Sequence, residues 1–408
     1  MTQPFVLSGP ALQLPRVLTR SLELLPDGGL VSAFFVYRDT SGDPLVNDGQ
    51  DFYVRRFDAD ATPAPGDRMV ATTGWQVPTP AWYRPFRDPE ATVMQDGKVL
   101  FTWRLENNIY FGISPNSPGQ NPDLYSAIYD PATHTVTPPA LFPTALDANV
   151  DSAVGTVASL HAVERLSDGK LVMVSTAYGG NLDALQDIKL TLMDAGGSVL
   201  RSAIVNVETF GYQSQPAVTV LPQGFVVLWT DHAAAPDDAS GTAVRARLFD
   251  NEGQPLTDAI LVNTTTVGEQ GVAVAADLPG GGFVVTWQQA TPIGEPAWDW
   301  EVDVRMQRFA ADGSKLGPEA LVSTTTSGRQ NDTAVHSFSD GSFLVVWNHD
   351  MQAIRGRYFD AAGAAIGDEF QVGTTTEYNP RLKITEAADA RLLVTWGISY
   401  GGTGSGGQ

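Results

Sequence analysis

Proton-transfer chemistry in this chain would fall to a small set of side chains, because the sequence holds only five histidines and no cysteine. His161, His232 and His349 stand beside stretches whose length varies between copies of a repeat, and a neutral imidazole there could accept a substrate proton. The phenol of Tyr178 and the guanidinium of Arg104 could stabilise an anion formed next to a carboxylate. These five residues support the hypothesis of a polysaccharide lyase, although only a shared face of the fold links them.

Two aspartates could hold a metal ion. Asp231 and Asp350 follow predicted strands, and together with Asp237, Asp238 and loop carbonyls they offer the hard oxygen ligands that Ca²⁺ prefers. The competing interpretation is that they are turn aspartates. The absence of cysteine excludes disulfides and thiolate metal sites, so Ca²⁺ is the cofactor that the residues suggest.

Large aromatic side chains gather in the stretches that interrupt the repeat. Exposed rings reduce solubility unless they pack or bind, and their flat apolar faces match those of sugar rings. A glycan or polysaccharide is therefore the expected ligand, with packing of the loops on themselves as the alternative. The candidate ligand-binding residues are Trp75, Trp82, Tyr83, Arg87, Tyr110, Trp298 and Trp300.

A degenerate repeat must position these residues. Its first motif, LLPDGGLVSAF from Leu24, recurs as VMQDGKVLFTW, RLSDGKLVMVS, VLPQGFVVLW, DLPGGGFVVTW, SFSDGSFLVVW and AADARLLVTW. A second motif ends in an aromatic residue and aspartate, as in VRRFDADA and RGRYFDAAG, and a third recurs as LVNTTT, LVSTTT and QVGTTT. Each copy thus holds four short β-type runs separated by turn residues, and copies recur about every 49 to 72 residues.

Four strands per copy at this spacing predict the blades of a β-propeller. We expect an all-β fold with one propeller over residues 1–396, seven blades of mostly four antiparallel strands, and a Gly-rich tail over 397–408. The last copy shows only its first two strands. The N-terminal run FVLS (residues 5–8) is therefore predicted to complete the final blade and close the ring, which protects open strand edges. An array of β-sandwiches is the main alternative.

The turns indicate which residues share a face. Turns between the first and second strands are short and rich in Asp-Gly, and those after the aromatic–Asp motif are short too, so both lie on one face. The longer, variable connections then lie on the opposite face, where a binding surface is expected. A tryptophan repeated at the end of the second strand is predicted to be core packing. These residues are Trp103, Trp229, Trp287, Trp347 and Trp396.

Other polar residues are expected to have structural roles. Gln213, Gln270 and Gln330 recur at one repeat position and are predicted to cap backbone groups. His336 lies within a predicted strand, and His134 lies in a predicted turn at the surface.

Composition limits the partners. Against 25 basic residues the chain has 46 acidic ones, a formal net charge of −21, which repels nucleic acid and anionic lipid. No apolar run approaches a membrane span, and the N-terminus shows no Sec-type signal. We therefore expect no nucleic-acid partner and no membrane insertion. The oligomeric state is left open.

The stretches 250–287 and 312–347 follow the pattern FDADG…VNTTTxGxQ…LPDGGFVVTW. This pattern resembles the propeller-type repeats of large secreted bacterial proteins of the RTX class, many of them exported by type I systems. The calcium-binding nonapeptide GGxGxDxUx of that class is absent. The resemblance implies a propeller located outside a bacterial cell or on its surface.

Three hypotheses for function follow. The leading one is a binding propeller that recognises a glycan or polymer on the face with long loops. The second is a carbohydrate-active enzyme on the same face, a lyase in the first place. The third is a structural module of a larger surface protein.

Overall fold

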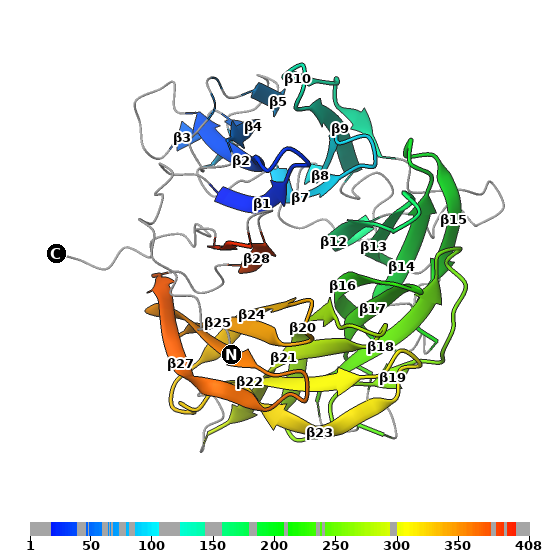
Figure 1. Ribbon diagram of the computed structural model, residues 1–408. Coiled ribbons are helices and arrows are strands. Elements are labelled where there is room, and N and C mark those ends of the chain that lie inside the picture. Colours follow the sequence, from blue (N-terminus) through cyan, green and yellow to red (C-terminus); the bar gives the residue numbers. More distant parts are fainter. Residues whose placement is uncertain are drawn as a thin grey trace.

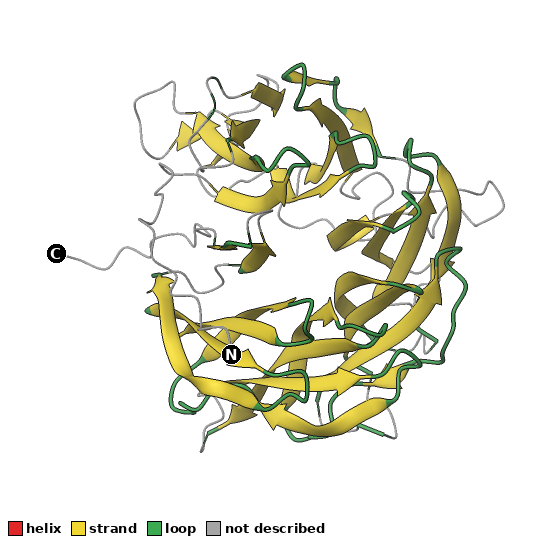
Figure 2. Ribbon diagram, in the orientation of Figure 1, coloured by secondary structure: helices red, strands yellow, loops and turns green. Residues whose placement is uncertain are grey.

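The computed structural model describes residues 18–38, 46–47, 49–58, 64, 66, 68–72, 79–80, 86–105, 123–142, 157–178, 186–207, 211–233, 237–238, 241–293, 300–376, 381–386 and 390–396. Every regular element among them is a β-strand (Figure 2). Within these ranges there is no helix long and apolar enough to cross a membrane. The prediction of an all-β fold is confirmed.

The described strands form seven blades around a central axis (Figure 1). In blades 1 to 6 antiparallel strands follow one another outward from the axis, and blade 7 has two described strands. A further short pair, β3 (Val46–Asn47) with β6 (Thr79–Pro80), accompanies blade 1. Blade 1 consists of β1 (Leu18–Leu24), β2 (Leu30–Arg38), β4 (Gly49–Phe57) and β5 (Arg68–Thr72), and blade 2 of β7 (Phe86–Val93), β8 (Val99–Leu105), β9 (Asp123–Asp130), β10 (Thr135–Val136) and β11 (Ala140–Leu141). Blade 3 consists of β12 (Val157–Arg165), β13 (Leu171–Tyr178), β14 (Gln186–Met193) and β15 (Val199–Ile204), and blade 4 of β16 (Gln213–Leu221), β17 (Gly224–Asp231), β18 (Ala243–Asp250) and β19 (Ile260–Leu261). Blade 5 consists of β20 (Glu269–Asp277), β21 (Phe283–Pro292), β22 (Trp300–Phe309) and β23 (Lys315–Leu321), blade 6 of β24 (Gln330–Ser337), β25 (Phe343–His349), β26 (Ala353–Phe359) and β27 (Ala365–Thr374), and blade 7 of β28 (Lys383–Glu386) and β29 (Leu392–Thr395).

The blades close into a ring. The innermost strands β1, β7, β12, β16, β20, β24 and β28 lie side by side in that order, and β28 also lies beside β1. Across this closing boundary Lys383 of β28 donates a hydrogen bond to Glu23 of β1. The predicted seven-bladed propeller is confirmed. The N-terminal run at 5–8 and the tail at 397–408 lie outside the described residues.

Short turns join strands on one face of the ring, as predicted. The Gly28 N–H donates to the Leu25 carbonyl at 2.9 Å, and Gly28 has φ of 83°, a conformation that glycine reaches without strain. In the turn after β18, Asp250 Oδ1 accepts from the backbone N–H groups of Glu252 and Gln254. The other connections leave from the opposite face. We call this the long-loop face; it comprises the ends of β8, β13, β17, β21 and β25 and the starts of β7, β12, β16, β20 and β24.

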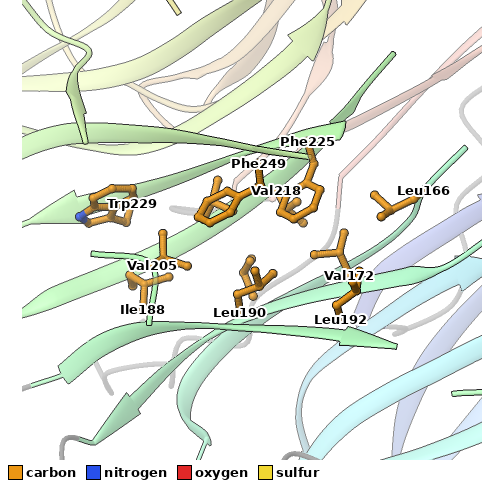
Figure 3. Close-up of a cluster of buried hydrophobic side chains, with 12 residues drawn as sticks. Leu166, Val172, Ile188, Leu190, Leu192, Val205, Val218, Phe225, Trp229 and Phe249 are labelled. Carbon is orange, nitrogen blue, oxygen red and sulfur yellow. The ribbon is translucent and has the colours of Figure 1, made fainter. Parts of the chain in front are cut away.

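Apolar side chains fill the space between neighbouring blades. Ile188 and Leu190 of β14 face Trp229 of β17 and Phe249 of β18 (Figure 3). The repeated tryptophans have the predicted packing role, because Trp103, Trp229, Trp287 and Trp347 are at most 2 % exposed and Trp396 packs against the core of blade 6. Both faces of a blade are apolar, so each blade needs a neighbour on either side to bury them.

A buried asparagine adds a polar link between blades. Asn263, which is 0 % exposed, accepts from the Val244 N–H of its own blade at 3.0 Å. Its amide nitrogen donates to Asp238 Oδ2 at 2.8 Å and lies 3.4 Å from Gln270 Oε1 on the inner strand of blade 5. Asn206 makes the equivalent contacts between blades 3 and 4, with the Ile188 N–H, Asp187 and Gln213.

The threonines after Asn263 form a second link. The backbone N–H groups of Thr264 and Thr265 donate to Glu319 Oε2 on β23 of blade 5, at 2.6 Å and 3.0 Å. Glu319 Oε1 also accepts from Arg305 of β22 at 2.9 Å. The same arrangement recurs between blades 5 and 6 with Thr324, Thr325, Glu369 and Arg355. The threonines of the NTTT motif and of its STTT copy therefore join blades 4 and 5 to the outer strands of blades 5 and 6.

The inner strands carry a β-bulge near the long-loop face. In blades 4 to 6 one residue at the bulge is left-handed, with φ between 51° and 53° at Gln215, Val272 and Asp332. Arg381, just before β28, has φ of 51° as well. Such a conformation is strained for residues other than glycine and persists where surrounding contacts hold it. Gln215 Oε1 accepts from the Val272 N–H at 3.0 Å, and Asp332 accepts from the Arg381 N–H. The bulge residues Gln215 and Asp332 thus each supply a side-chain acceptor to a backbone N–H of the next blade.

Replacing Asn263 tests the polar link. In Asn263→Ala the buried Val244 N–H and the Asp238 carboxylate both lose a partner, so the free energy of unfolding should fall by ~2–4 kcal/mol. Urea denaturation followed by tryptophan fluorescence measures this. The control is Asn251→Ala, in the short turn after β18. A stability of Asn263→Ala equal to that of the control would contradict the link.

Candidate functional site

The structure spreads the predicted catalytic residues over four blades, and it places His161 midway along its strand instead of at the long-loop face. Arg104 lies in β8 of blade 2, and His161 and Tyr178 lie in β12 and β13 of blade 3, where only their backbones are described. His232 follows β17 of blade 4, and His349 ends β25 of blade 6. Blade 5 stands between these last two histidines, so the structure does not bring His232 and His349 together.

Most of the predicted ligand-binding set lies outside the described residues. Trp300 begins β22 and is half-buried, and the backbone of Arg87 lies in β7. The remaining members lie outside the described ranges: Trp75, Trp82, Tyr83, Tyr110 and Trp298.

The chemistry-bearing contact described on this face joins Ser214 and His232. Ser214 Oγ of β16 lies 2.9 Å from His232 Nε2, within hydrogen-bonding distance. The backbone N–H of His232 donates to the Tyr212 carbonyl at 2.9 Å, and the two rings meet edge to face with their centroids 4.9 Å apart. These contacts fix the imidazole in position while leaving it exposed to solvent. Sequence analysis singled out His232 but missed Ser214.

The surroundings hold His232 neutral. Partial removal from water lowers the pKa of the imidazole, while the carboxylates of Glu269 and Asp231 act in the opposite direction. Near neutral pH, Nε2 can therefore accept the hydroxyl proton of Ser214 when Nδ1 carries the ring proton.

Asp231, a predicted metal ligand, is 4 % exposed and bonded to protein groups. Its Oδ1 accepts from the Ala233 N–H at 2.9 Å, and its Oδ2 accepts from Arg245 Nε at 3.3 Å. Arg245 also makes two hydrogen bonds of 2.6 Å to Asp237, which lower the pKa of that carboxyl. Asp231 thus helps to anchor the loop after β17 on blade 4.

The repeat explains why Arg245 turns to these aspartates. Arg245 lies opposite Trp229, as Arg305 and Arg355 lie opposite the tryptophans of blades 5 and 6. Those two arginines pair with Glu319 and Glu369 on the outer strand. Blade 4 has Ala259 at the position of these glutamates. Arg245 therefore pairs with Asp231 at the end of β17 and with Asp237 in the loop that follows.

The aspartate of blade 6 is also bonded to the protein. Asp350 Oδ1 accepts from the Arg329 N–H at 2.6 Å, and the neighbouring His349 Nδ1 lies 3.3 Å from Gln330 Nε2. In the part of the chain that the structure describes, no three His, Cys, Asp or Glu side chains form a group that could hold a metal ion. Calcium binding by Asp231 or Asp350 stays a prediction.

Several residues expected to be structural form internal contacts. Gln270 and Gln330 donate to the carbonyls of Val267 and Ser327, which confirms their capping role, whereas Gln213 bonds to the side chain of Asp231. His336 Nε2 lies 3.0 Å from Glu386 of blade 7, and His134 Nδ1 lies 3.1 Å from the Tyr129 hydroxyl.

Charged side chains from separate blades also meet near the axis, a cluster that sequence analysis missed. Glu23 of β1 accepts from Lys383 of β28, and Glu164 of β12 lies within electrostatic reach of both. Desolvation by the surrounding protein raises the pKa of Glu164 to about 7. The charge of Lys383 opposes this shift and that of Glu23 adds to it, and part of the side chain stays exposed to water. The contact depends on ring closure, since it joins blades 1, 3 and 7.

The raised pKa of Glu164 predicts how stability depends on pH. Between pH 4.5, the ordinary value, and about 7 the folded chain holds a proton that the unfolded chain has lost, so this contribution is full below pH 4.5 and disappears as pH approaches 7. Glu164→Gln should remove it. Because solvent screens the site, the stability difference between variant and wild type should change by about 1 kcal/mol between pH 5 and pH 8.

Urea titrations at several pH values measure this difference, and Glu252→Gln, in an exposed turn, is the control. A difference between Glu164→Gln and wild type that stays constant with pH would refute the assignment.

Comparison with known proteins identifies the fold. No protein-family model matches the sequence, and a search of curated proteins gives no match. Among solved structures, an α-L-arabinanase from Penicillium chrysogenum complexed with arabinobiose is 12 % identical, with 76 % of this chain and 88 % of that chain covered and a TM-score of 0.50. The GH93 α-L-arabinofuranosidase of Fusarium graminearum with arabinobiose is 13 % identical, with 75 % and 87 % covered and a TM-score of 0.51.

A protein of unknown function from Dyadobacter fermentans is 13 % identical over 86 % of this chain and 93 % of its own, with a TM-score of 0.51. At these identities the similarity shows a shared propeller fold.

Proposed function

We propose that this chain recognises a glycan on the long-loop face, near the axis of the ring. The observation that carries the proposal is the ring pair of Tyr212 and His232, which is fixed by hydrogen bonds and leaves the imidazole exposed. A sugar ring can pack on such a pair with little loss of side-chain entropy, because the rings are already held in place. Trp300 adds an aromatic side chain at the same face of the neighbouring blade.

The charge of the chain favours a neutral glycan. With a formal net charge of −21, the protein repels polymers of uronic acids. Lyase chemistry acts next to a carboxylate, so its usual substrates carry the disfavoured charge. Two of the structures that share this fold were solved with arabinobiose, a neutral disaccharide.

A carbohydrate-active enzyme is the second candidate, and here hydrolysis is favoured over the predicted lyase reaction. The matching structures include enzymes named as an arabinanase and an arabinofuranosidase. Glycoside hydrolysis commonly uses two carboxyl groups, one of them protonated near neutral pH. Glu164, with its raised pKa, and the nearby Glu23 are carboxyl groups of this kind. They lie at the ends of β12 and β1 that lead into the short turns, so this hydrolase site would be on the side of the ring opposite the long-loop face.

The setting predicted from the repeat belongs to the same proposal. A glycan-recognising propeller fits a bacterial protein of the cell surface or the medium, and calcium could bind its acidic loops. If the chain bound no carbohydrate, its role as a structural module of a larger surface protein would be favoured.

Glycan binding can be measured directly. A glycan array followed by calorimetry should show binding to neutral oligosaccharides such as arabino-oligosaccharides and none to polyuronates. Tyr212→Ala and Trp300→Ala should each weaken binding at least ~10-fold, about 1.4 kcal/mol, because each removes an aromatic surface.

Leu316→Ala, which changes an exposed side chain on the outer strand of blade 5, is the control and should leave binding unchanged. The proposal would be overturned if the wild-type chain bound no glycan of the panel, or if Tyr212→Ala and Trp300→Ala bound as tightly as the wild-type chain. Release of reducing sugar that is lost in Glu164→Gln would favour the hydrolase.

A further inference from the structure

Blade 4 departs from its neighbours at two positions that face each other. Ser214 stands where blades 5 and 6 have Gly271 and Asn331, as the strand registers show. His232, three residues after the repeated tryptophan, stands where those blades have Ala290 and Asp350. The serine–histidine contact is therefore absent from the equivalent sites of blades 5 and 6.

The geometry of this pair suits nucleophilic catalysis. The distance of 2.9 Å between Ser214 Oγ and His232 Nε2 is that of a nucleophile bonded to its general base. The imidazole is oriented by the Tyr212 ring and by its own backbone hydrogen bond to Tyr212. The carboxylates of Glu269 and Asp231 lie close enough to stabilise an imidazolium once it forms.

The backbone that carries Ser214 is held firmly. The next residue, Gln215, is left-handed with φ of 53°. Two hydrogen bonds hold its side chain: Oε1 accepts from the Thr230 hydroxyl at 2.7 Å and from the Val272 N–H of blade 5 at 3.0 Å. Val272 and Asp332 are left-handed at the equivalent positions of blades 5 and 6, so the bulge beside Ser214 belongs to the repeated frame that holds this backbone in place.

We propose that Ser214 and His232 form a nucleophile–base pair that hydrolyses carboxylic esters. Ser214 Oγ attacks the carbonyl carbon while its proton passes to His232 Nε2. The ester C–O bond breaks, and the leaving alkoxide takes that proton from His232. Water, deprotonated by His232 Nε2, then attacks the carbonyl carbon of the acyl-serine. The bond from this carbon to Ser214 Oγ breaks, the carboxylic acid leaves, and His232 returns the proton to Ser214 Oγ.

The substrate class follows from the position of the pair, and this step rests on the proposed function. Ser214 is 8 % exposed and lies against the exposed ring of His232, on which a glycan would pack. O-acyl groups on a neutral glycan, such as O-acetyl esters, would present their carbonyl carbon there. The reaction would remove the acyl group and leave the sugar chain intact.

The alternative is that the hydrogen bond only ties β16 to the end of β17. A fluorophosphonate probe separates the two, because it phosphonylates a serine activated by a base and leaves an ordinary serine untouched. We expect the folded wild-type chain to hydrolyse p-nitrophenyl acetate, and mass spectrometry to place the adduct on Ser214.

Two variants and one control complete the test. Ser214→Ala should abolish labelling and hydrolysis, and His232→Gln should lower both at least ~100-fold. His134→Gln, which alters a histidine in a turn of blade 2, should keep both within about 2-fold. The rate should rise with pH through a midpoint below the ordinary histidine value of about 6.5, since the pKa of His232 is lowered. Melting temperatures show whether each variant folds.

The results separate this proposal from glycan binding. If Ser214 is labelled but no glycan binds, the esterase activity is supported and acylated glycans are excluded as its substrates. Glycan binding with no labelling of Ser214 in the wild-type chain would overturn the esterase and leave the proposed function standing.

Discussion

Each blade has two apolar faces, and the rest of the structure depends on covering both of them. Trp229 and Phe249 of blade 4, for example, are buried by Ile188 and Leu190 of blade 3. Polar links then determine how neighbouring blades sit. Asn263, Thr264 and Gln215 each form a hydrogen bond across a blade boundary. Because the last inner strand lies beside the first, every face has a neighbour and the ring has no end.

This frame accounts for where function can reside. The links repeat most regularly in blades 4 to 6, and a regular frame leaves few residues available for chemistry. The exceptions are side chains that break the repeat, Ser214 and His232 on the long-loop face, and the charges of Glu23, Glu164 and Lys383 near the axis. Both groups are positioned by strands that the links hold in register. The glycan and esterase proposals rest on the first of them.

Much of the fold could be predicted from the sequence, because its signals are local and repeated. The Asp-Gly turns, the tryptophans of the second strands and the capping by Gln270 and Gln330 all follow from periodicity and turn chemistry. The candidate site was harder to predict. Ser214 meets His232 diagonally across the β16–β17 pair, in a register that changes at the bulge between Ser214 and Ala217, and a single sequence gives no sign of that register. Glu164 and Lys383 meet through ring closure, although more than 200 residues separate them. The ion pair of Asp231 with Arg245 was also hidden in the sequence, because it depends on one blade-specific residue, Ala259, where blades 5 and 6 have Glu319 and Glu369.

The central claim is that the blades form one closed, mutually linked ring. Native-state hydrogen exchange followed by mass spectrometry at increasing urea tests it most directly, because it resolves the opening of each inner strand. A closed ring predicts that amides of β1, β7, β12, β16, β20, β24 and β28 become exchangeable in one transition with a common free energy. Separate transitions, with blades 4 to 6 remaining protected after the others have opened, would contradict the account and indicate blades that fold as independent units.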